Sequence, residues 1–190
     1  MTDITPDMVK GPGARRVHTW DAFVRAFHWT LVTLVALDAF VLDPESEPHA
    51  VAGYAIAALI VLRLVWGFVG GRNARFSAFP PSLSAAKRHA SALARGEKEP
   101  PHESHNPLGA LMVYNLLASL ALITATGVAM KSDAFWGVKW VEEAHEVLVN
   151  WLLISVGLHV AGVIFETRRS GVNLVRAMVT GWKNLPGQSG

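Results

Sequence analysis

The segment VNWLLISVGLHVAGVIFE (residues 149–166) is an apolar run with one imidazole, His159, near its middle. It belongs to one of four long apolar blocks that charged loops separate. The chain has 190 residues, 51% of them hydrophobic and 17% charged, and its mean hydropathy is +0.29. Apolar runs of about 20 residues are long enough to cross a bilayer as helices. The composition therefore predicts a membrane protein, in which a histidine at this depth needs a reason.

The four blocks predict an all-α protein, a transmembrane four-helix bundle with spans at about 21–42, 49–71, 106–130 and 141–166. The first block lacks a small-residue cleavage site, so we expect it to be retained. One domain over 18–183 is expected, with a disordered tail at 1–17 and a short tail at 184–190. Segments 82–96 and 171–183 mix apolar and basic residues and are expected to form short interfacial amphipathic helices.

The basic residues predict the orientation of the spans. Fourteen of the 17 Lys and Arg lie before or early in the first block, in the loop after the second, or after the fourth. The other two loops hold only Lys131 and Lys139, and Arg63 lies inside the second block. The positive-inside rule then places both termini in the cytoplasm, in a bacterial inner membrane. This pattern explains the pI near 9.2 without nucleic-acid binding.

Four of the eight histidines lie in or at the ends of the blocks, at two predicted depths. His28 and His159 lie about two turns from the cytoplasmic face, and His49 and His145 lie at the periplasmic face. His145 and His159 are 14 residues apart, so they share nearly the same stripe of one helix, roughly 21 Å apart along its axis. A single membrane histidine is explained by a hydrogen bond to a neighbouring helix, but two pairs on different helices indicate a function.

The residue types favour haem over other ligands. The chain has no cysteine, which excludes disulfides, iron–sulfur clusters and covalent c-type haem. Zinc would need three or four clustered donors, and a proton relay would need more carboxylates at closer spacing. A b-type haem needs an apolar slot, two opposed histidines and a positive group near its propionates. Arg63 lies at the depth of the inner pair, so we predict two b haems, one at each depth.

Several segments together resemble the bacterial cytochrome b561 family, which includes the b-type cytochrome subunits of nickel–iron hydrogenases. They are RAFHW (25–29), the stretch 48–79, HNPLGALMV (105–113), EEAHEVL (142–148) and LHVAGVIFE (158–166). The resemblance implies two haems, an inner one on His28 and His159 and an outer one on His49 and His145, with Arg63 at an inner propionate. It also implies electron exchange between a redox partner and the quinone pool.

Three further polar residues leave alternatives open. Arg25 either meets a haem propionate or extends its charge to the cytoplasmic interface. His105 either takes part in a quinone or propionate site or is a surface residue beside the start of the third span. Asp38 either moves protons or reaches the periplasmic interface.

The sequence thus predicts a diheme cytochrome in contact with membrane lipid. It would carry electrons between quinone and a periplasmic c-type cytochrome or dehydrogenase. One alternative is an anchor subunit of a hydrogenase or other dehydrogenase. Another is a superoxide:quinone oxidoreductase that draws its substrate with Lys131 and Lys139. An alternative of another class is a haem-free scaffold or a metal or proton transporter. Whether the chain is an enzyme by itself stays open.

Overall fold

The computed structural model describes residues 15–97 and 102–185, and four helices within them are long and apolar enough to cross a membrane. These helices are α1 (Ala22–Phe40), α2 (Glu47–Val69), α4 (Pro107–Met130) and α5 (Lys139–Ser170). The predicted all-α membrane four-helix bundle is therefore confirmed, and the chain is a multi-pass membrane protein.

Capping residues determine where the spans begin and end. The side chain of Asp21 accepts the Val24 N–H at 2.8 Å at the start of α1. Asn106 accepts the Gly109 N–H at 2.7 Å at the start of α4, as its place before Pro107 predicts. Gly171 ends α5 in the left-handed conformation, with φ 71°. Such a residue stops a helix without the steric penalty that a side chain would add.

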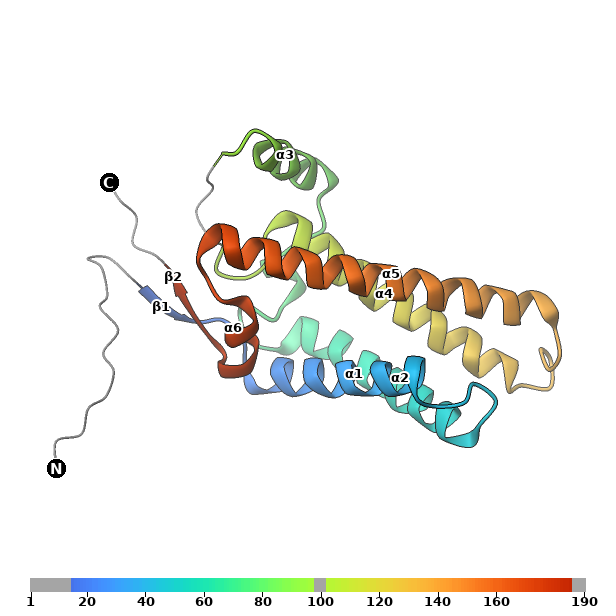
Figure 1. Ribbon diagram of the computed structural model, residues 1–190. Coiled ribbons are helices and arrows are strands. Elements are labelled where there is room, and N and C mark those ends of the chain that lie inside the picture. The colour runs from blue at the N-terminus through green and yellow to red at the C-terminus, as the bar shows by residue number, and fades with distance from the viewer. Residues whose placement is uncertain (1–14, 98–101, 186–190) are drawn as a thin grey trace, which may run out of the picture.

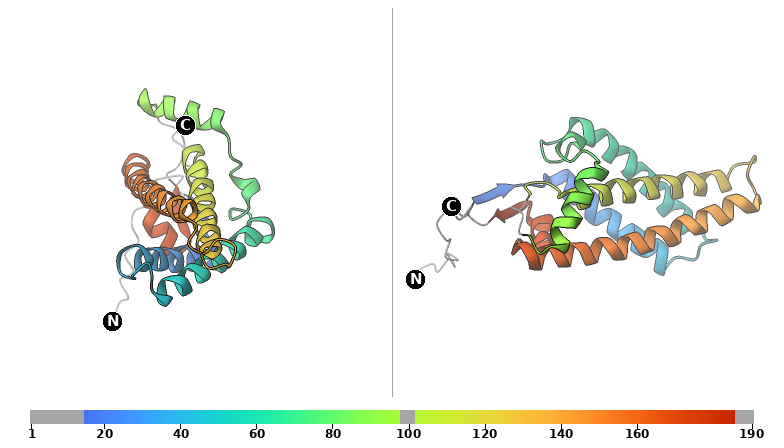
Figure 2. Two further views of the ribbon diagram at one scale, coloured as in Figure 1. Left: turned by 90° about the vertical axis from the view of Figure 1, so that its right-hand side faces the viewer. Right: turned by 90° about the horizontal axis from the view of Figure 1, so that it is seen from above.

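The spans pack in sequence as a bundle. α4 runs along α5, α2 packs on α4, and α1 packs on α2, so that α4 and α5 lie over α1 and α2 (Figures 1 and 2). All four helices contribute to one buried core, made of Phe27, Ile56, Ile60, Leu117, Leu120 and Leu152. The outward faces are also apolar: Val61 is 60% exposed, Phe68 73% and Leu158 60%. Such surfaces suit lipid and would be unfavourable in water.

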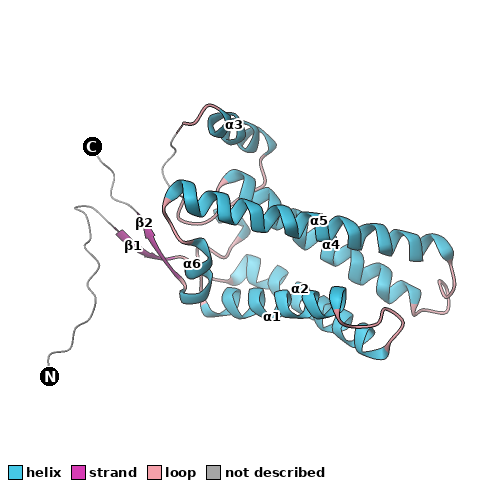
Figure 3. Cartoon of the chain, in the orientation of Figure 1, coloured by secondary structure: helices cyan, strands magenta, loops and turns pink. Residues whose placement is uncertain are grey.

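The two ends of the bundle differ. One end, here called the inner end, carries α3 (Leu83–Ala94), the 3-10 helix η1 (Phe76–Ala78), α6 (Leu174–Thr180) and the two strands (Figures 1 and 3). β1 (Arg15–His18) and β2 (Trp182–Leu185) pair antiparallel, with Arg15 opposite Leu185. The opposite end, here called the outer end, carries the α1–α2 and α4–α5 connections.

Several predicted boundaries were wrong. Residues 15–17 are not a disordered tail, because they form most of β1; residues 1–14 lie outside the described part of the chain. Segment 171–183 is not one amphipathic helix, because Gly181, with φ 87°, ends α6 and turns the chain into β2. β2 also includes the first two residues of the predicted tail at 184–190, and 186–190 are not described. The helix predicted at 82–96 is present as α3.

Polar contacts close the inner end. The N–H groups of Thr19 and Trp20 donate to the Gly181 carbonyl at 2.8 and 3.1 Å. The ammonium group of Lys183 donates to the carbonyls of His102, Glu103 and Ser104, at 3.2, 3.0 and 2.6 Å. Burial lowers the pKa of Lys183 to about 8. These contacts join β1, β2 and the segment before α4, so the inner ends of α1 and α4 are held together.

Candidate functional site

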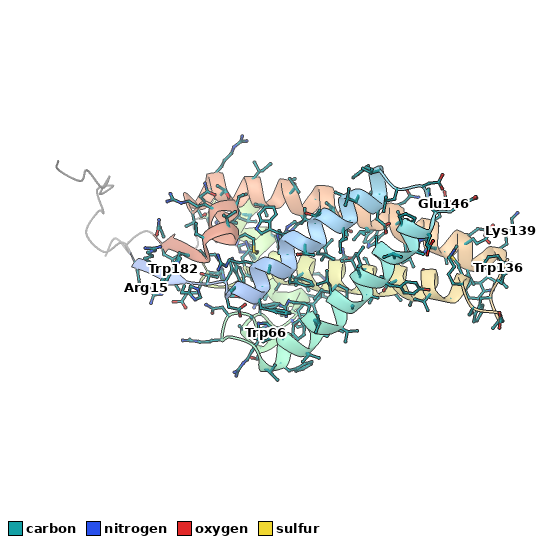
Figure 4. The ribbon with its side chains drawn as sticks, turned by 90° about the horizontal axis from the view of Figure 1, so that it is seen from below. Arg15, Trp66, Trp136, Lys139, Glu146 and Trp182 are labelled. Atoms are coloured by element: carbon teal, nitrogen blue, oxygen red, sulfur yellow. The ribbon has the colours of Figure 1, made fainter. Side chains whose placement is uncertain are left out.

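At the outer end, the structure brings His49 of α2 and His145 of α5 together. The two imidazoles interact electrostatically with each other and with the carboxylate of Asp38, which lies on α1. His49 lies in the first turn of α2 and His145 in the second turn of α5, and both helices start at this end. In Figure 4, the labelled residues Trp136, Lys139 and Glu146 mark the outer end.

Each outer imidazole has a polar neighbour at its Nδ1 atom. Asp38 Oδ1 lies 2.9 Å from Nδ1 of His49, and the Thr126 hydroxyl lies 2.9 Å from Nδ1 of His145. The Thr126 hydroxyl also lies 3.0 and 2.9 Å from the carbonyls of Leu122 and Ile123 in its own helix. The one hydroxyl proton is donated there, so the Thr126 oxygen accepts a hydrogen bond from the Nδ1–H of His145.

These neighbours favour one tautomer in both outer histidines. A carboxylate oxygen 2.9 Å from an unprotonated ring nitrogen would be repelled, so Nδ1 of His49 carries the proton. The ring meets the carboxylate at a poor angle for a hydrogen bond, so within the described residues neither atom has a hydrogen-bond partner. With Nδ1 protonated on His49 and His145, both Nε2 lone pairs are free to bind a metal.

A glycine admits His145 against the neighbouring helix. A Cβ atom added at Gly127 of α4 would lie 3.3 Å from Cε1 of His145. This is closer than ordinary van der Waals contact, so the small residue lets the imidazole approach the α4 backbone.

At the inner level, His28 of α1 and His159 of α5 lie close enough to interact electrostatically. Both side chains are half-buried. Nδ1 of His28 is buried and has no hydrogen-bond partner within the described segments. The inner pair therefore matches the outer pair in residue type but differs from it in the polar groups around the rings.

Arg63 is a buried cation whose bonding is incomplete. Its side chain is 5% exposed, and one guanidinium nitrogen donates to the Ala74 carbonyl at 3.1 Å. The guanidinium also lies over the Phe76 ring, 5.1 Å from its centre. The other terminal nitrogen, Nη1, is buried without a hydrogen-bond partner in 15–97 or 102–185. A buried, incompletely bonded arginine favours an additional anionic group.

The structure gives Arg25 and His105 definite neighbours. Arg25 donates from Nη1 to the Val179 carbonyl at 2.8 Å, so it joins α1 to the end of α6. His105 lies between the rings of Trp20 and Phe79, with centroids 4.8 and 4.6 Å away. Burial, with the nearby positive charge of Lys183 and Arg63, lowers the pKa of His105 to about 3. His105 is thus a neutral imidazole and not a solvated surface group.

The donor set fits haem better than a metal ion coordinated only by protein. Within 15–97 and 102–185, no group of three or more His, Asp or Glu side chains is arranged to hold a metal ion. The two histidines on separate helices at each level, with apolar walls between the levels, would hold the iron of a haem at that level. The unpartnered Nη1 of Arg63 at the inner level suits a propionate.

A family model described as prokaryotic cytochrome b561 matches residues 19–181. The chain belongs to the prokaryotic cytochrome b561 family. This membership makes it a membrane b-type cytochrome that binds haem b and transfers electrons.

The chain is similar to a protein of Azotobacter vinelandii named "Probable Ni/Fe-hydrogenase B-type cytochrome subunit". It is 23% identical over 213 residues, a match that covers 88% of each chain. No solved structure matches this cytochrome.

For this b561 cytochrome, sequence reasoning missed the two residues that lie beside the Nδ1 atoms of the outer histidines. Asp38 was expected at the interface or in proton movement, but it lies against His49. The sequence did contain a signal for this contact. Asp38 lies in the last turn of α1 and His49 in the first turn of α2, and the short connection between them places both at one depth. No comparable signal pointed to Thr126, because its contact with His145 depends on how α4 is rotated against α5.

Proposed function

We propose that this cytochrome holds two b haems and carries electrons across the membrane between a periplasmic redox partner and the quinone pool. The observation that carries the proposal is the pairing of His28 with His159 and of His49 with His145, on different helices at two levels. Bound haem would supply one-electron chemistry at each level. The four histidines would hold the two irons, and the apolar walls between the helices would exclude water.

Two arginines are placed to receive the propionates of the inner haem. Arg63 offers its free Nη1. Arg25 has Nη1 engaged by Val179, so only its buried Nε is left without a hydrogen-bond partner within the described residues. We therefore assign the main propionate contact to Arg63.

The inner end is the cytoplasmic end in this proposal, and the membrane is the bacterial inner membrane. The support is the charge distribution: the described part of the inner end and its flanking segments carry most of the Lys and Arg. Trp66 and Trp182 lie toward this end and Trp136 toward the other, as interfacial aromatic residues would (Figure 4).

We place the quinone near the inner haem, beside His105. A hollow of about 530 Å³ opens there between the segment after α2 and the segment before α4. It is lined by Arg72, Asn73, Arg75, Ser77, Ala78 and 102–105. Polar groups of this kind suit a quinone head group, and His105 interacts electrostatically with His159 of the inner pair. The hollow is therefore within the surroundings of the inner haem.

A second candidate is the subunit form of the same activity, in which a hydrogenase or other dehydrogenase supplies the electrons. The name of the Azotobacter relative favours it.

Charge at the outer end disfavours the superoxide alternative, because acids outnumber Lys131 and Lys139 there. The exposed acids are Asp43, Glu45, Glu47, Asp133, Glu142, Glu143 and Glu146. Such a surface repels a small anion and suits a basic region of a protein partner.

Liposome transport tests the function directly. The protein is reconstituted with ferricyanide trapped inside, and a membrane-impermeant reductant is added outside. We expect the trapped ferricyanide to be reduced by the wild type but not by His28→Ala or His49→Ala, because each variant lacks one haem of the route. Reduction by either variant at the wild-type rate would contradict a route through both levels.

A further inference from the structure

The two histidine pairs differ in the polar groups that lie beside their Nδ1 atoms. At the outer level, Asp38 faces His49 and Thr126 faces His145, each at 2.9 Å. At the inner level, Nδ1 of His28 has no partner within the described residues. Nδ1 of His49 makes no well-aligned hydrogen bond either, so what distinguishes His49 is the adjacent carboxylate of Asp38, while His145 has the hydroxyl of Thr126.

We propose that Asp38 and Thr126 are positioning residues of the outer haem, and that the carboxylate of Asp38 lowers the midpoint potential of that haem. The inference rests on the proposed function, since it needs iron between His49 and His145. Asp38 and Thr126 do not touch the iron; they act through the two imidazoles.

The positioning role follows from the tautomers. A histidine that ligates through Nε2 needs its proton on Nδ1 and a ring orientation that aims Nε2 at the metal. Thr126 on α4 provides a hydrogen-bond acceptor for a histidine on α5, and Asp38 on α1 provides a charged neighbour that favours the Nδ1 proton of a histidine on α2. Each contact also joins two helices, so the ring orientation is fixed from a neighbouring helix.

The potential shift follows from the charge of Asp38. A carboxylate 2.9 Å from Nδ1 places negative charge beside the ring, which would stabilise the more positive ferric state over the ferrous state even without a well-aligned hydrogen bond. The side chains of Asp38 and His49 are 17% and 26% exposed, so water screens the interaction only weakly. The hydroxyl of Thr126 is neutral and has its proton engaged within α4, so its effect on potential is smaller.

The test compares haem potentials in purified full-length protein. Asp38→Asn keeps the size of the side chain and removes its charge. Thr126→Val removes the acceptor for His145. Asp133→Asn is the matched control, because Asp133 is an exposed carboxylate at the same end. Potentiometric titration of the visible haem bands gives two midpoints, and the same titration in a His28→Ala background assigns the outer one.

We expect Asp38→Asn to raise the midpoint of the outer haem and leave the inner one unchanged, while Asp133→Asn changes neither. We expect Thr126→Val to weaken outer haem binding by about tenfold, measured as faster transfer to apomyoglobin. Two haems whose midpoints in Asp38→Asn equal those of the control would overturn this inference alone. A wild-type protein with no haem between His49 and His145 would overturn the proposed function and this inference with it.

Discussion

At the scale of single residues, Gly127 shows how closely the outer histidine is packed. Its place on α4 leaves no ordinary room for a methyl group beside the His145 ring, since the added carbon would lie 3.3 Å from Cε1. Other glycines of the bundle, such as Gly157, have nothing within 4 Å of an added Cβ. The two positions therefore separate the effect of crowding from the effect of helix propensity.

We predict that Gly127→Ala displaces the His145 ring and reduces haem at the outer level. The displacement would also disturb the contact of Nδ1 with Thr126. The measurement is haem content and the reduced-minus-oxidised spectrum of the purified variant, with Gly157→Ala as the control. Equal spectra for the two variants would show that close approach at Gly127 is unimportant.

His105 makes the fold sensitive to acid. Its pKa is lowered to about 3 by burial and nearby positive charge, from an ordinary value of 6.5. Between these values the unfolded chain binds a proton that the folded chain does not, so folded stability falls as the pH decreases from about 6.5 toward 3.

We predict that His105→Phe weakens this pH dependence, because phenylalanine keeps a ring between Trp20 and Phe79 and cannot be protonated. Thermal unfolding in detergent at pH 7.5 and pH 4.5 provides the measurement. The control is His18→Gln, a change at an exposed histidine of the same end. A wild-type-like drop in Tm for His105→Phe would exclude this histidine as the source.

At the scale of elements, one polar residue holds α4 against α5 inside the apolar region. Asn115 donates to the Ser155 hydroxyl at 2.9 Å and accepts the indole N–H of Trp151 at 3.0 Å. Hydrogen bonds between membrane helices contribute about 0.6 kcal/mol each on average.

We predict that Asn115→Leu lowers the free energy of unfolding by about 1 kcal/mol, because two such bonds are lost. Chemical unfolding in mixed micelles measures it. Asn150→Leu is a matched control, since Asn150 is exposed and donates only to Glu146 of its own helix. A loss no larger than that of the control would mean that Asn115 does not join the helices.

The elements also show what the sequence could predict and what it could not. The spans were predictable because hydropathy and charge act locally, and the cap at Asn106 was visible beside Pro107. The fourth span was predicted to end at about 166, but Gly171 stops α5 only after Ser170. β1 and β2 were missed because four-residue strands form only when the two ends of the chain meet.

The candidate site could likewise be predicted only in part from the sequence. Depth and spacing alone selected the four histidines and Arg63 as candidates, because a polar residue is conspicuous inside an apolar span. The packing of His105 between Trp20 and Phe79 was not found, because it depends on how the loops of the inner end fold together.

At the scale of the whole molecule, both described ends of the chain lie at one end of the bundle (Figure 1). The chain has no cysteine, so single engineered cysteines report their side of the membrane without background. Position 133 lies in the α4–α5 connection, and position 88 lies on α3 at the inner end.

We predict that a membrane-impermeant maleimide labels Asp133→Cys but not Arg88→Cys in intact spheroplasts, because α3 faces the cytoplasm. Both cysteines should react after the membrane is permeabilised, which serves as the control for accessibility. The reverse pattern in intact cells would invert the proposed orientation.

The most direct test of the account as a whole is the haem-to-protein ratio of the wild type and of the four single variants His28→Ala, His49→Ala, His145→Ala and His159→Ala. We predict two haems per chain in the wild type and one in each variant. His28→Ala and His159→Ala should keep the same remaining spectrum, and His49→Ala and His145→Ala should share the other. A wild-type ratio near zero or one, or spectra that group the histidines differently, would contradict two haems held by these two pairs.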